Sequence, residues 1–423
     1  MKPPLRITTW VIPLCYAVIA VTAGMIFPRL ELGLFHELSS TVTVSAAIAI
    51  YSSIASGMMA LTGVVFSLAF VMIQFSATAY SPRLVLWVSR DPFLWHAAGI
   101  FTATFLYAIA ALAWVGRTSP DRVPFVSSMV VIALLMASVG MFIGLIQRIG
   151  LLQINRMLNF TGDQGRKVIE ALYTRLDSSS PAKESEDFRR LPLAQTLVHR
   201  TRPQSIQALD AAPLVNLAKA SGGVIEMLIS VGDTVVDFTP LLKVFGASQP
   251  IDERALTKAI GFGDERTFEQ DPKYALRLLV DIAIKALSPA INDPTTAVQA
   301  LDQIEDLLLR LGRRRLEIGQ FHDSEGKLRL VVPYPAWEDF LLLAFDEIRY
   351  YGARSVQVMR RMKALINDLA ARLPQERHSA LRHWEDRLQT TIARSFEDAE
   401  EKLEAAIEDR QGLGVPRRKS PAS

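Results

Sequence analysis

Four long stretches without a charged residue follow one another in the first third of this 423-residue chain. They cover residues 7–28, 38–82, 92–116 and 123–147. A membrane-spanning helix needs about 20 mostly apolar residues to cross a hydrocarbon core of about 30 Å. The pattern therefore predicts four spans, at about residues 9–27, 57–75, 93–115 and 126–147. It limits the chain to functions that operate from a bilayer.

The second uncharged stretch is too long for one simple span. It holds 45 residues, which as a helix would reach about 68 Å at 1.5 Å per residue. We therefore expect this helix either to project beyond the bilayer or to break. Serine and glycine are concentrated at residues 52–57, the expected point of a break or of close packing. A protruding or interfacial helix would precede the span from about Thr43.

Small side chains recur within the predicted spans at a spacing that lets helices approach closely. They are Gly57, Gly63, Ser67, Gly140 and Gly144. Two interpretations stay open: packing of helices within one chain, and a subunit interface or pore-facing stripe. No charged residue lies in the middle of a predicted span, which weighs against a carrier coupled to ions or protons. A channel lined by hydroxyls, backbone and apolar side chains needs none.

Charge divides the chain into two parts. The first 148 residues hold eight basic and four acidic residues, a balance of +4, and the remaining 275 hold 38 and 39, a balance of −1. Basic residues in short loops favour the cytoplasmic side, and a cytoplasmic N-terminus places six of them inside and three outside. The inner set is Lys2, Arg6, Arg83, Arg90, Arg148 and Arg156, and the outer set is Arg29, Arg117 and Arg122. We therefore expect both termini in the cytoplasm, and no nucleic-acid partner for the nearly neutral C-terminal part.

The residue types that usually carry catalysis or hold metals form no recognisable motif. Cys15 is the only cysteine and the six histidines are scattered, so neither a disulfide nor a zinc site is predicted. The phosphate-loop, zinc-protease and nucleophile-elbow patterns do not occur in the sequence. We expect no cofactor and no enzyme activity, with a hydrolase centred on Asp293 as the one enzymatic alternative.

The apolar spacing along the whole sequence predicts a mostly α fold. We expect a four-helix transmembrane bundle followed by a cytoplasmic α+β domain with a small β-barrel-like element and long C-terminal helices. The expected parts are a transmembrane domain at 1–148, a juxtamembrane helix and linker at 149–190, a small β-rich subdomain at 191–248, a helical domain at 249–411 with a hairpin near 317–332, and a disordered tail at 412–423.

Within the C-terminal part, strand and helix signals alternate. Residues 223–229 and 234–238 read as strands, and a tight turn at 231–233 lies between them. Two long amphipathic helices are expected at 336–373, with a kink at Gly352, and at 374–411.

Asp-Pro pairs mark the expected starts of three helices. They stand at 91–92, 271–272 and 293–294. Aspartate suits the N-cap because its carboxylate accepts from free backbone N–H groups, and proline suits the next position because it has no N–H to satisfy. The pairs therefore predict helices at 272–287 and 294–311, joined by residues 288–293.

The segment between these two helices is also the best candidate for a binding site. In the structural interpretation, its polar residues only stop one helix and cap the next. In the functional interpretation, they surround a helix N-terminus that holds an anion or carbonyl group, or they supply oxygen ligands to a hard cation. The candidate residues are Arg266, Asp271, Asp281, Ser288, Asn292, Asp293, Thr295 and Thr296.

The same segment carries a resemblance. Residues 286–297 read Ala-Leu-Ser-Pro-Ala-Ile-Asn-Asp-Pro-Thr-Thr-Ala. With Arg266-Thr267, Gln270-Asp271-Pro272 and Asp281-Ile282-Ala283 upstream, and with Gly63–Ser67 and Tyr80–Leu84 near the second span, this run resembles the signature of a family of bacterial predicted multi-pass membrane proteins classed as a domain of unknown function.

The resemblance covers nearly the whole chain and implies a bacterial inner-membrane location, with no established activity. The chain departs from it at Asp237-Phe238, where a glycine-containing turn is expected.

Two functions fit these expectations. The first is an oligomeric pore for ions or small solutes, gated by the cytoplasmic domain, and the long second stretch favours it. The second is a membrane-tethered sensor or scaffold that binds a small ligand or a protein through the cytoplasmic domain. The partners expected are the lipid bilayer and further copies of the chain.

Overall fold

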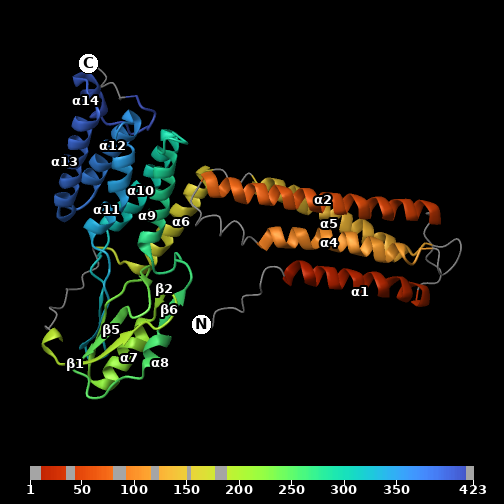
Figure 1. Cartoon of the computed structure of the whole chain (residues 1–423), viewed down its shortest axis with the longest axis horizontal. Coiled ribbons are helices and arrows are strands. Elements are labelled where there is room, and N and C mark those ends of the chain that lie inside the picture. The colour runs from red at the N-terminus through yellow and green to blue at the C-terminus, as the bar shows by residue number, and fades with distance from the viewer. Residues whose placement is uncertain are drawn as a thin grey trace. The chain divides into compact units, whose positions relative to one another are not determined.

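The computed structural model places a long helix on each of the four uncharged stretches (Figure 1). These helices are α1 (Val11–Leu34), α2 (Val44–Ala79), α4 (Pro92–Leu112) and α5 (Phe125–Ile149). All four are long and apolar enough to cross a membrane. The prediction of four spans at the start of a mostly helical chain is therefore confirmed.

The structure describes residues 11–34, 43–79, 92–115, 123–149, 154–176 and 188–415. The chain divides into two compact units, Met1–Gln153 and Ile154–Ser423. Each unit has its own core. A helix was also predicted to start at the Asp91-Pro92 pair. Helix α4 does begin at Pro92, and Asp91 lies outside the described residues.

Helix α4 lies at the centre of the membrane unit. It contacts α1, α2 and α5, and nine of its residues are buried. Alanines and glycines allow this: the Gly99 backbone lies against the ring of Tyr16 on α1, so closely that a Cβ there would collide with the ring. With no hydrophobic drive between helices in lipid, such close van der Waals contact is what holds them together.

The structure decides between the two alternatives left open for the second stretch. The helix α2 is continuous over 36 residues, about 54 Å at 1.5 Å per residue, so the break at 52–57 does not occur. Serine and glycine weaken a helix by only about 1 kcal/mol each, and packing of Ala47, Tyr51 and Ala55 into the bundle core outweighs that. The predicted span 57–75 lies entirely within this helix, Val44–Ala79. The first helix also continues past the predicted end at residue 27, to Leu34.

The second unit contains two sheets. The five-stranded sheet has the order β1-β5-β3-β8-β7 and the three-stranded sheet the order β4-β2-β6. All strand pairs are antiparallel except β3 with β8. The strands are β1 (Leu193–Val198), β2 (Gln204–Leu209), β3 (Val224–Met227), β4 (Thr234–Val235), β5 (Pro240–Phe245), β6 (Ile260–Gly263), β7 (Gln320–His322) and β8 (Leu328–Val331).

The pairing of the strands adds what the sequence did not predict. The turn at 231–233 joins β3 to β4, and these two strands lie in different sheets. Strands β6, β7 and β8 show that the sheets extend beyond the predicted range 191–248. By contrast, β7 and β8 pair as a hairpin inside the predicted 317–332. The turn at Asp237-Phe238 forms without glycine, because Phe238 itself takes a positive φ of 64°.

Helices cover the sheets and build a layer of their own (Figure 1). Beside the sheets lie α7 (Ala211–Ser221), α8 (Glu253–Lys258) and the short turn η2 (Phe188–Arg190). The helical layer holds α6 (Ile154–Leu172), α9 (Pro272–Ala286), α10 (Pro294–Gly312), α11 (Trp337–Tyr351), α12 (Val356–Arg372), η3 (Gln375–Arg377), α13 (His378–Ser395) and α14 (Ala399–Ala405). Ten residues of α9 and eleven of α10 are buried, which makes this pair the centre of the layer.

The C-terminal helices are shorter than predicted. The expected helix 336–373 divides into α11 and α12 at Gly352, and Ser355 then caps α12 by accepting from Val358 N. The expected helix 374–411 divides into η3, α13 and α14. The predicted tail is also partly ordered, since Gly412 O accepts from Gln357 and Gly414 O from Arg360. Residues 416–423 lie outside the described residues.

Candidate functional site

The signature segment 286–297 forms the connection between α9 and α10. Asn292 takes a positive φ of 50°. Asp293 then caps α10: its Oδ1 accepts from Thr296 N at 3.1 Å and its Oδ2 from Thr296 Oγ1 at 2.6 Å. Ser288 Oγ donates to Lys285 O at 2.7 Å. These polar groups are thus occupied in ending one helix and starting the next, while Thr295 is exposed.

Arg266 and Asp271 form a second group at the other end of α9. The guanidinium donates to Asp271 Oδ2 from Nε at 2.9 Å and from Nη2 at 2.6 Å. Asp271 Oδ1 accepts from Lys273 N and so caps α9. The side chain of Asp271 is only 1 % exposed. A side chain at Gly232 would collide with both partners, so the turn at 231–233 lies directly against this ion pair.

Burial dominates the electrostatics of this second group. It raises the pKa of the Asp271 carboxyl, although the charge of Arg266 and its hydrogen bonds act in the opposite direction. Burial also raises the pKa of the Tyr173 hydroxyl, which is in electrostatic range of Asp271 and Tyr334. That hydroxyl has no hydrogen-bond partner in the part of the chain that the structure describes. The pair therefore lies between the turn at 231–233 and the start of α9, with the Asp271 carboxyl buried.

Asp281 belongs to a third group. It accepts from Arg277 Nε at 2.7 Å, and Arg277 also pairs with Glu347 of α11. Asp281 thus helps fasten α9 to α11.

The predicted convergence on one site is therefore wrong. Asp271 and Ser288 flank opposite ends of α9, whose 15 residues span about 22 Å at 1.5 Å per residue. Contacts among the described candidates join Arg266 with Asp271, Asp293 with Thr296, and Ser288 with Asn292, whose backbone N donates to Ser288 O at 2.8 Å. Among the described residues, no group of His, Cys, Asp or Glu could hold a metal ion.

The small residues of the spans fall into two classes. Gly144 is a packing residue, since a Cβ there would lie 2.5 Å from the ring of Phe93 on α4. Gly57, Gly63 and Gly140 face open space, with nothing within 4 Å of an added Cβ. Ser67 is likewise exposed.

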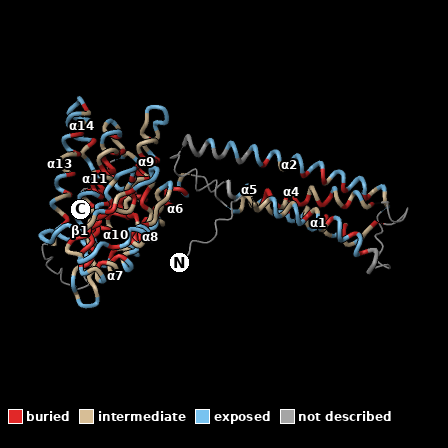
Figure 2. Tube along the Cα trace, turned by 60° about the horizontal axis from the view of Figure 1, so that its bottom comes forward, coloured by how far each residue is buried: buried red, intermediate tan, exposed pale blue. Residues whose placement is uncertain are grey.

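Helix α2 carries a continuous face of small side chains that its own bundle does not use. Its members follow one another at intervals of three or four residues, the spacing of a single helix face, and each is exposed. Figure 2 shows that much of α2 is exposed. The small-residue face consists of Ser45, Ala49, Ser52, Ser56, Ala60, Gly63 and Ser67. The opposite side of α2 carries Tyr51, Met58 and Val65, which are buried in the bundle.

Sequence reasoning missed the role of Glu31, because it placed this residue in a loop. Glu31 lies in α1 and is 5 % exposed. Its carboxylate accepts from Val126 N at 2.9 Å and from Ser127 N at 3.3 Å. A negative charge at a helix N-terminus satisfies both the free N–H groups and the helix dipole. Glu31 therefore fixes the end of α1 to the start of α5.

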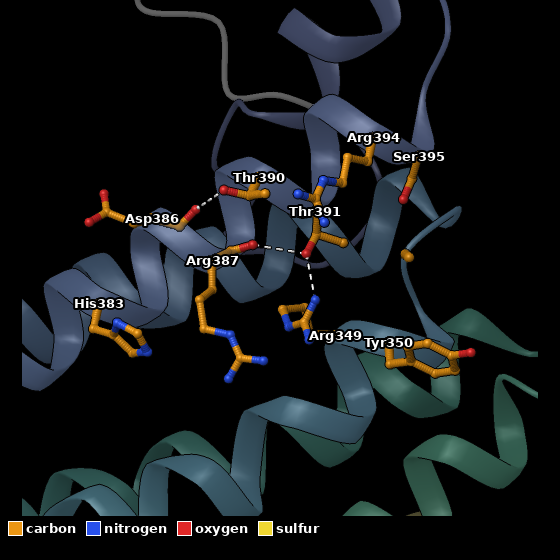
Figure 3. Close-up of a pocket in the computed structure, with 10 residues that line it drawn as sticks. Arg349, Tyr350, His383, Asp386, Arg387, Thr390, Thr391, Arg394 and Ser395 are labelled. Atoms are coloured by element: carbon orange, nitrogen blue, oxygen red, sulfur yellow. Dashed lines mark hydrogen bonds between the residues drawn. The ribbon is translucent and has the colours of Figure 1, made fainter.

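Sequence reasoning also missed a pocket between α11 and α13, of about 530 Å³ (Figure 3). Three arginines and four hydroxyl-bearing residues contribute to its lining. The lining includes Arg349, Tyr350, His383, Asp386, Arg387, Thr390, Thr391, Arg394 and Ser395.

A signal for this pocket does exist in the sequence. On α13, Arg387, Thr391 and Arg394 repeat at intervals of four and three residues, so they share one face. The apolar positions of the same helix, Leu388 and Ile392, are the ones that periodicity reveals first. That Arg349 of α11 stands opposite this polar face follows only from the tertiary structure.

Comparison with known proteins gives a membrane-protein family. The family model described as Predicted membrane protein (DUF2254) matches residues 6–368. An uncharacterized protein of Mycobacterium bovis is 27% identical over 375 residues, which cover 85% of this chain and 71% of that protein. An uncharacterized protein of Mycobacterium tuberculosis matches with the same identity and coverage. No solved structure matches the chain.

Proposed function

We propose that this chain, which belongs to the family described as Predicted membrane protein (DUF2254), forms an oligomeric pore. In this proposal the pore lies in the bacterial inner membrane, conducts ions or small solutes along an axis lined by α2, and is gated by the second unit. The excess of basic residues on the inner flanks of the spans supports a cytoplasmic location for both termini and for that unit.

The observation that carries the proposal is the small-residue face of α2. A face that none of the described helices of its own chain covers either meets lipid or meets another subunit. Large apolar side chains suit lipid, whereas here no member is larger than serine, and four of the seven carry a hydroxyl. Small side chains let helices from different subunits approach, and hydroxyls with exposed backbone can replace the hydration shell of a passing solute.

The side chains beside the small-residue face and the absence of charge along α2 agree with this arrangement. Met59, Val64 and Phe66 are exposed beside the small-residue face, where they would meet lipid or the neighbouring subunit. No charged residue occurs between residues 38 and 82, so the pathway would discriminate by size and hydration rather than by a ring of charge.

Cysteine accessibility tests the proposal, because Cys15 is the only native cysteine. On a Cys15→Ser background, purified Ser56→Cys protein should conduct in a planar bilayer and lose most of its current when a charged methanethiosulfonate reagent is added. The matched control is Met136→Cys on α5, whose native side chain is 66% exposed. Its current should not change.

Two results would contradict the pore. One is the absence of current under voltage, membrane tension and a range of candidate ligands. The other is disulfide formation between Ser56→Cys subunits without reagent access, since that outcome describes close-packed α2 helices and a solid bundle.

A further inference from the structure

The pocket between α11 and α13 has more positive than negative charge. Three arginines line it, Arg349, Arg387 and Arg394. Asp386 also lines the pocket, and Asp346 lies beside it and accepts from both Arg349 Nη2 at 3.1 Å and Arg387 Nη2 at 2.8 Å. Two carboxylates therefore face three guanidinium groups, and one carboxylate is shared. The imbalance favours an anion.

Several hydrogen-bond donors of this pocket are not used by the protein. Arg349 Nε is buried and has no partner in the part of the chain that the structure describes. Over the same described residues, the Arg394 guanidinium makes no hydrogen bond or ion pair. Arg387 uses one nitrogen on Asp346 while its plane lies over the Trp384 ring, 4.5 Å from the ring centroid. Stacking of this kind fixes the guanidinium plane and leaves its edge for an oxyanion.

Internal contacts hold part of this arrangement in place before any ligand arrives (Figure 3). Arg349 Nη1 donates to Thr391 Oγ1 at 2.7 Å, and Thr391 Oγ1 donates in turn to Arg387 O at 2.8 Å. Arg349 is therefore tied to the backbone of the facing helix through one hydroxyl. A donor that is already positioned loses less conformational entropy when it binds.

We propose that this pocket binds a soluble organic phosphate, with the phosphate held by Arg349, Arg387 and Arg394. Guanidinium groups match phosphate oxygens in paired hydrogen bonds. The volume of about 530 Å³ lies within the range of small-molecule sites, about 300–1,000 Å³, and exceeds what inorganic phosphate alone would fill. Tyr350 and His383 provide ring surfaces for the organic part of the ligand. The proposal depends on the second unit alone and stands apart from the pore.

Binding to the full-length protein tests this site. In phosphatidylcholine nanodiscs, adenosine 5′-triphosphate and pyrophosphate serve as probes, and isothermal calorimetry measures their dissociation constants. Arg394→Gln removes a guanidinium that makes no bond within the described residues, so it should weaken binding by roughly tenfold or more, the effect of about 1.4 kcal/mol, without lowering the melting temperature. Added salt should weaken binding as well.

The matched control is Arg382→Gln, an exposed arginine on α13 that does not line the pocket. Its dissociation constants should stay within about twofold of the wild-type values, below 0.5 kcal/mol. Equal weakening by Arg382→Gln and Arg394→Gln would overturn the proposal, and so would the absence of binding by both probes.

A second arm separates a soluble phosphate from a lipid headgroup. The same proteins are placed in nanodiscs that contain phosphatidylglycerol. If that lipid does not displace the soluble probes, the soluble ligand is supported. If phosphatidylglycerol binds in a manner that depends on Arg394 and neither soluble probe binds, the proposal is overturned in favour of a lipid headgroup. Conduction is not measured here, so failure of this site leaves the pore untouched, and failure of the pore leaves this site untouched.

Discussion

At the scale of a residue, Asp323 shows how one side chain can determine a hairpin. In the turn between β7 and β8, its Oδ1 accepts from Glu325 N at 2.9 Å and from Lys327 N at 3.0 Å, and its Oδ2 accepts from Arg329 Nε at 2.8 Å. Gly326 supplies the positive φ, 78°, that the turn needs. The carboxylate thus satisfies three donors in one loop, with its side chain 2 % exposed.

Acid should weaken this hairpin. The hydrogen bond from Arg329, together with those from the backbone, lowers the pKa of Asp323 from 3.8 to about 2. A lowered carboxyl pKa stabilises the fold above the unfolded-state value, and the stabilisation is lost as the pH falls through the folded-state value. We therefore expect Asp323→Asn to melt at a lower temperature near neutral pH and to lose less of its melting temperature between about pH 4 and about pH 2.

Circular dichroism of the detergent-solubilised full chain gives these melting temperatures. Asp264→Asn is the control, because Asp264 is 68% exposed and exposed ion pairs contribute little. An acid response of Asp323→Asn equal to that of the wild type would contradict the assignment.

At the scale of an element, glycine decides how closely two membrane helices pack. Gly144 of α5 lies against the Phe93 ring at the start of α4, whereas Gly140, one turn earlier, faces open space. Both are glycines on the same helix at a spacing of four, so sequence gives them equal weight. Only the neighbour on α4 distinguishes them.

This pair of glycines gives a matched test. Gly144→Ala should destabilise the membrane unit by about 1–3 kcal/mol, the usual effect of an extra methyl group in a filled contact. Gly140→Ala should be neutral or slightly stabilising, because alanine favours the helix by about 1 kcal/mol. Thermal unfolding in detergent measures both. Equal destabilisation by the two variants would show that the Phe93 contact is not as described.

At the scale of the whole molecule, two cores form independently. The second unit buries α9 and α10 among its own helices and fills its sheets with a separate apolar cluster. Helix α6, the first element of that unit, belongs to it: Gly165 lies against Leu307 and Ala275, and Arg166 pairs with Asp306 at 2.7 Å. A domain with its own core can fold without the rest of the chain.

A truncated chain tests this division. Residues 154–423 should be recovered without detergent and unfold in one cooperative transition, measured by calorimetry. A chain that begins at residue 188 lacks α6 and exposes the apolar surface of α9 and α10, so it should melt at a lower temperature or aggregate. Insolubility of the 154–423 fragment would contradict an independent second unit.

The sequence alone determined those features that depend on neighbours along the chain. Four uncharged stretches gave four spanning helices, because burying a charge in hydrocarbon is expensive at any position. The Asp-Pro pairs at 271–272 and 293–294 gave the starts of α9 and α10, because an N-cap is satisfied by the residues that follow it. The β7–β8 hairpin was predictable as well, because its two strands and its turn are neighbours along the chain.

Tertiary structure decided what depends on residues far apart. Packing against α4 kept α2 continuous through its serines, which local propensity alone would have allowed to break. Because β3 pairs with β8, about 100 residues later, and β4 pairs with β2, the two strands that flank the predicted tight turn lie in different sheets. The length of α9 separated Arg266 and Asp271 from the candidate residues of the signature segment, and the arginine pocket arose because α11 and α13 pack side by side. Sequence patterns carry the local energies of a chain, whereas the meeting of distant side chains is set by the sum of all packing contacts.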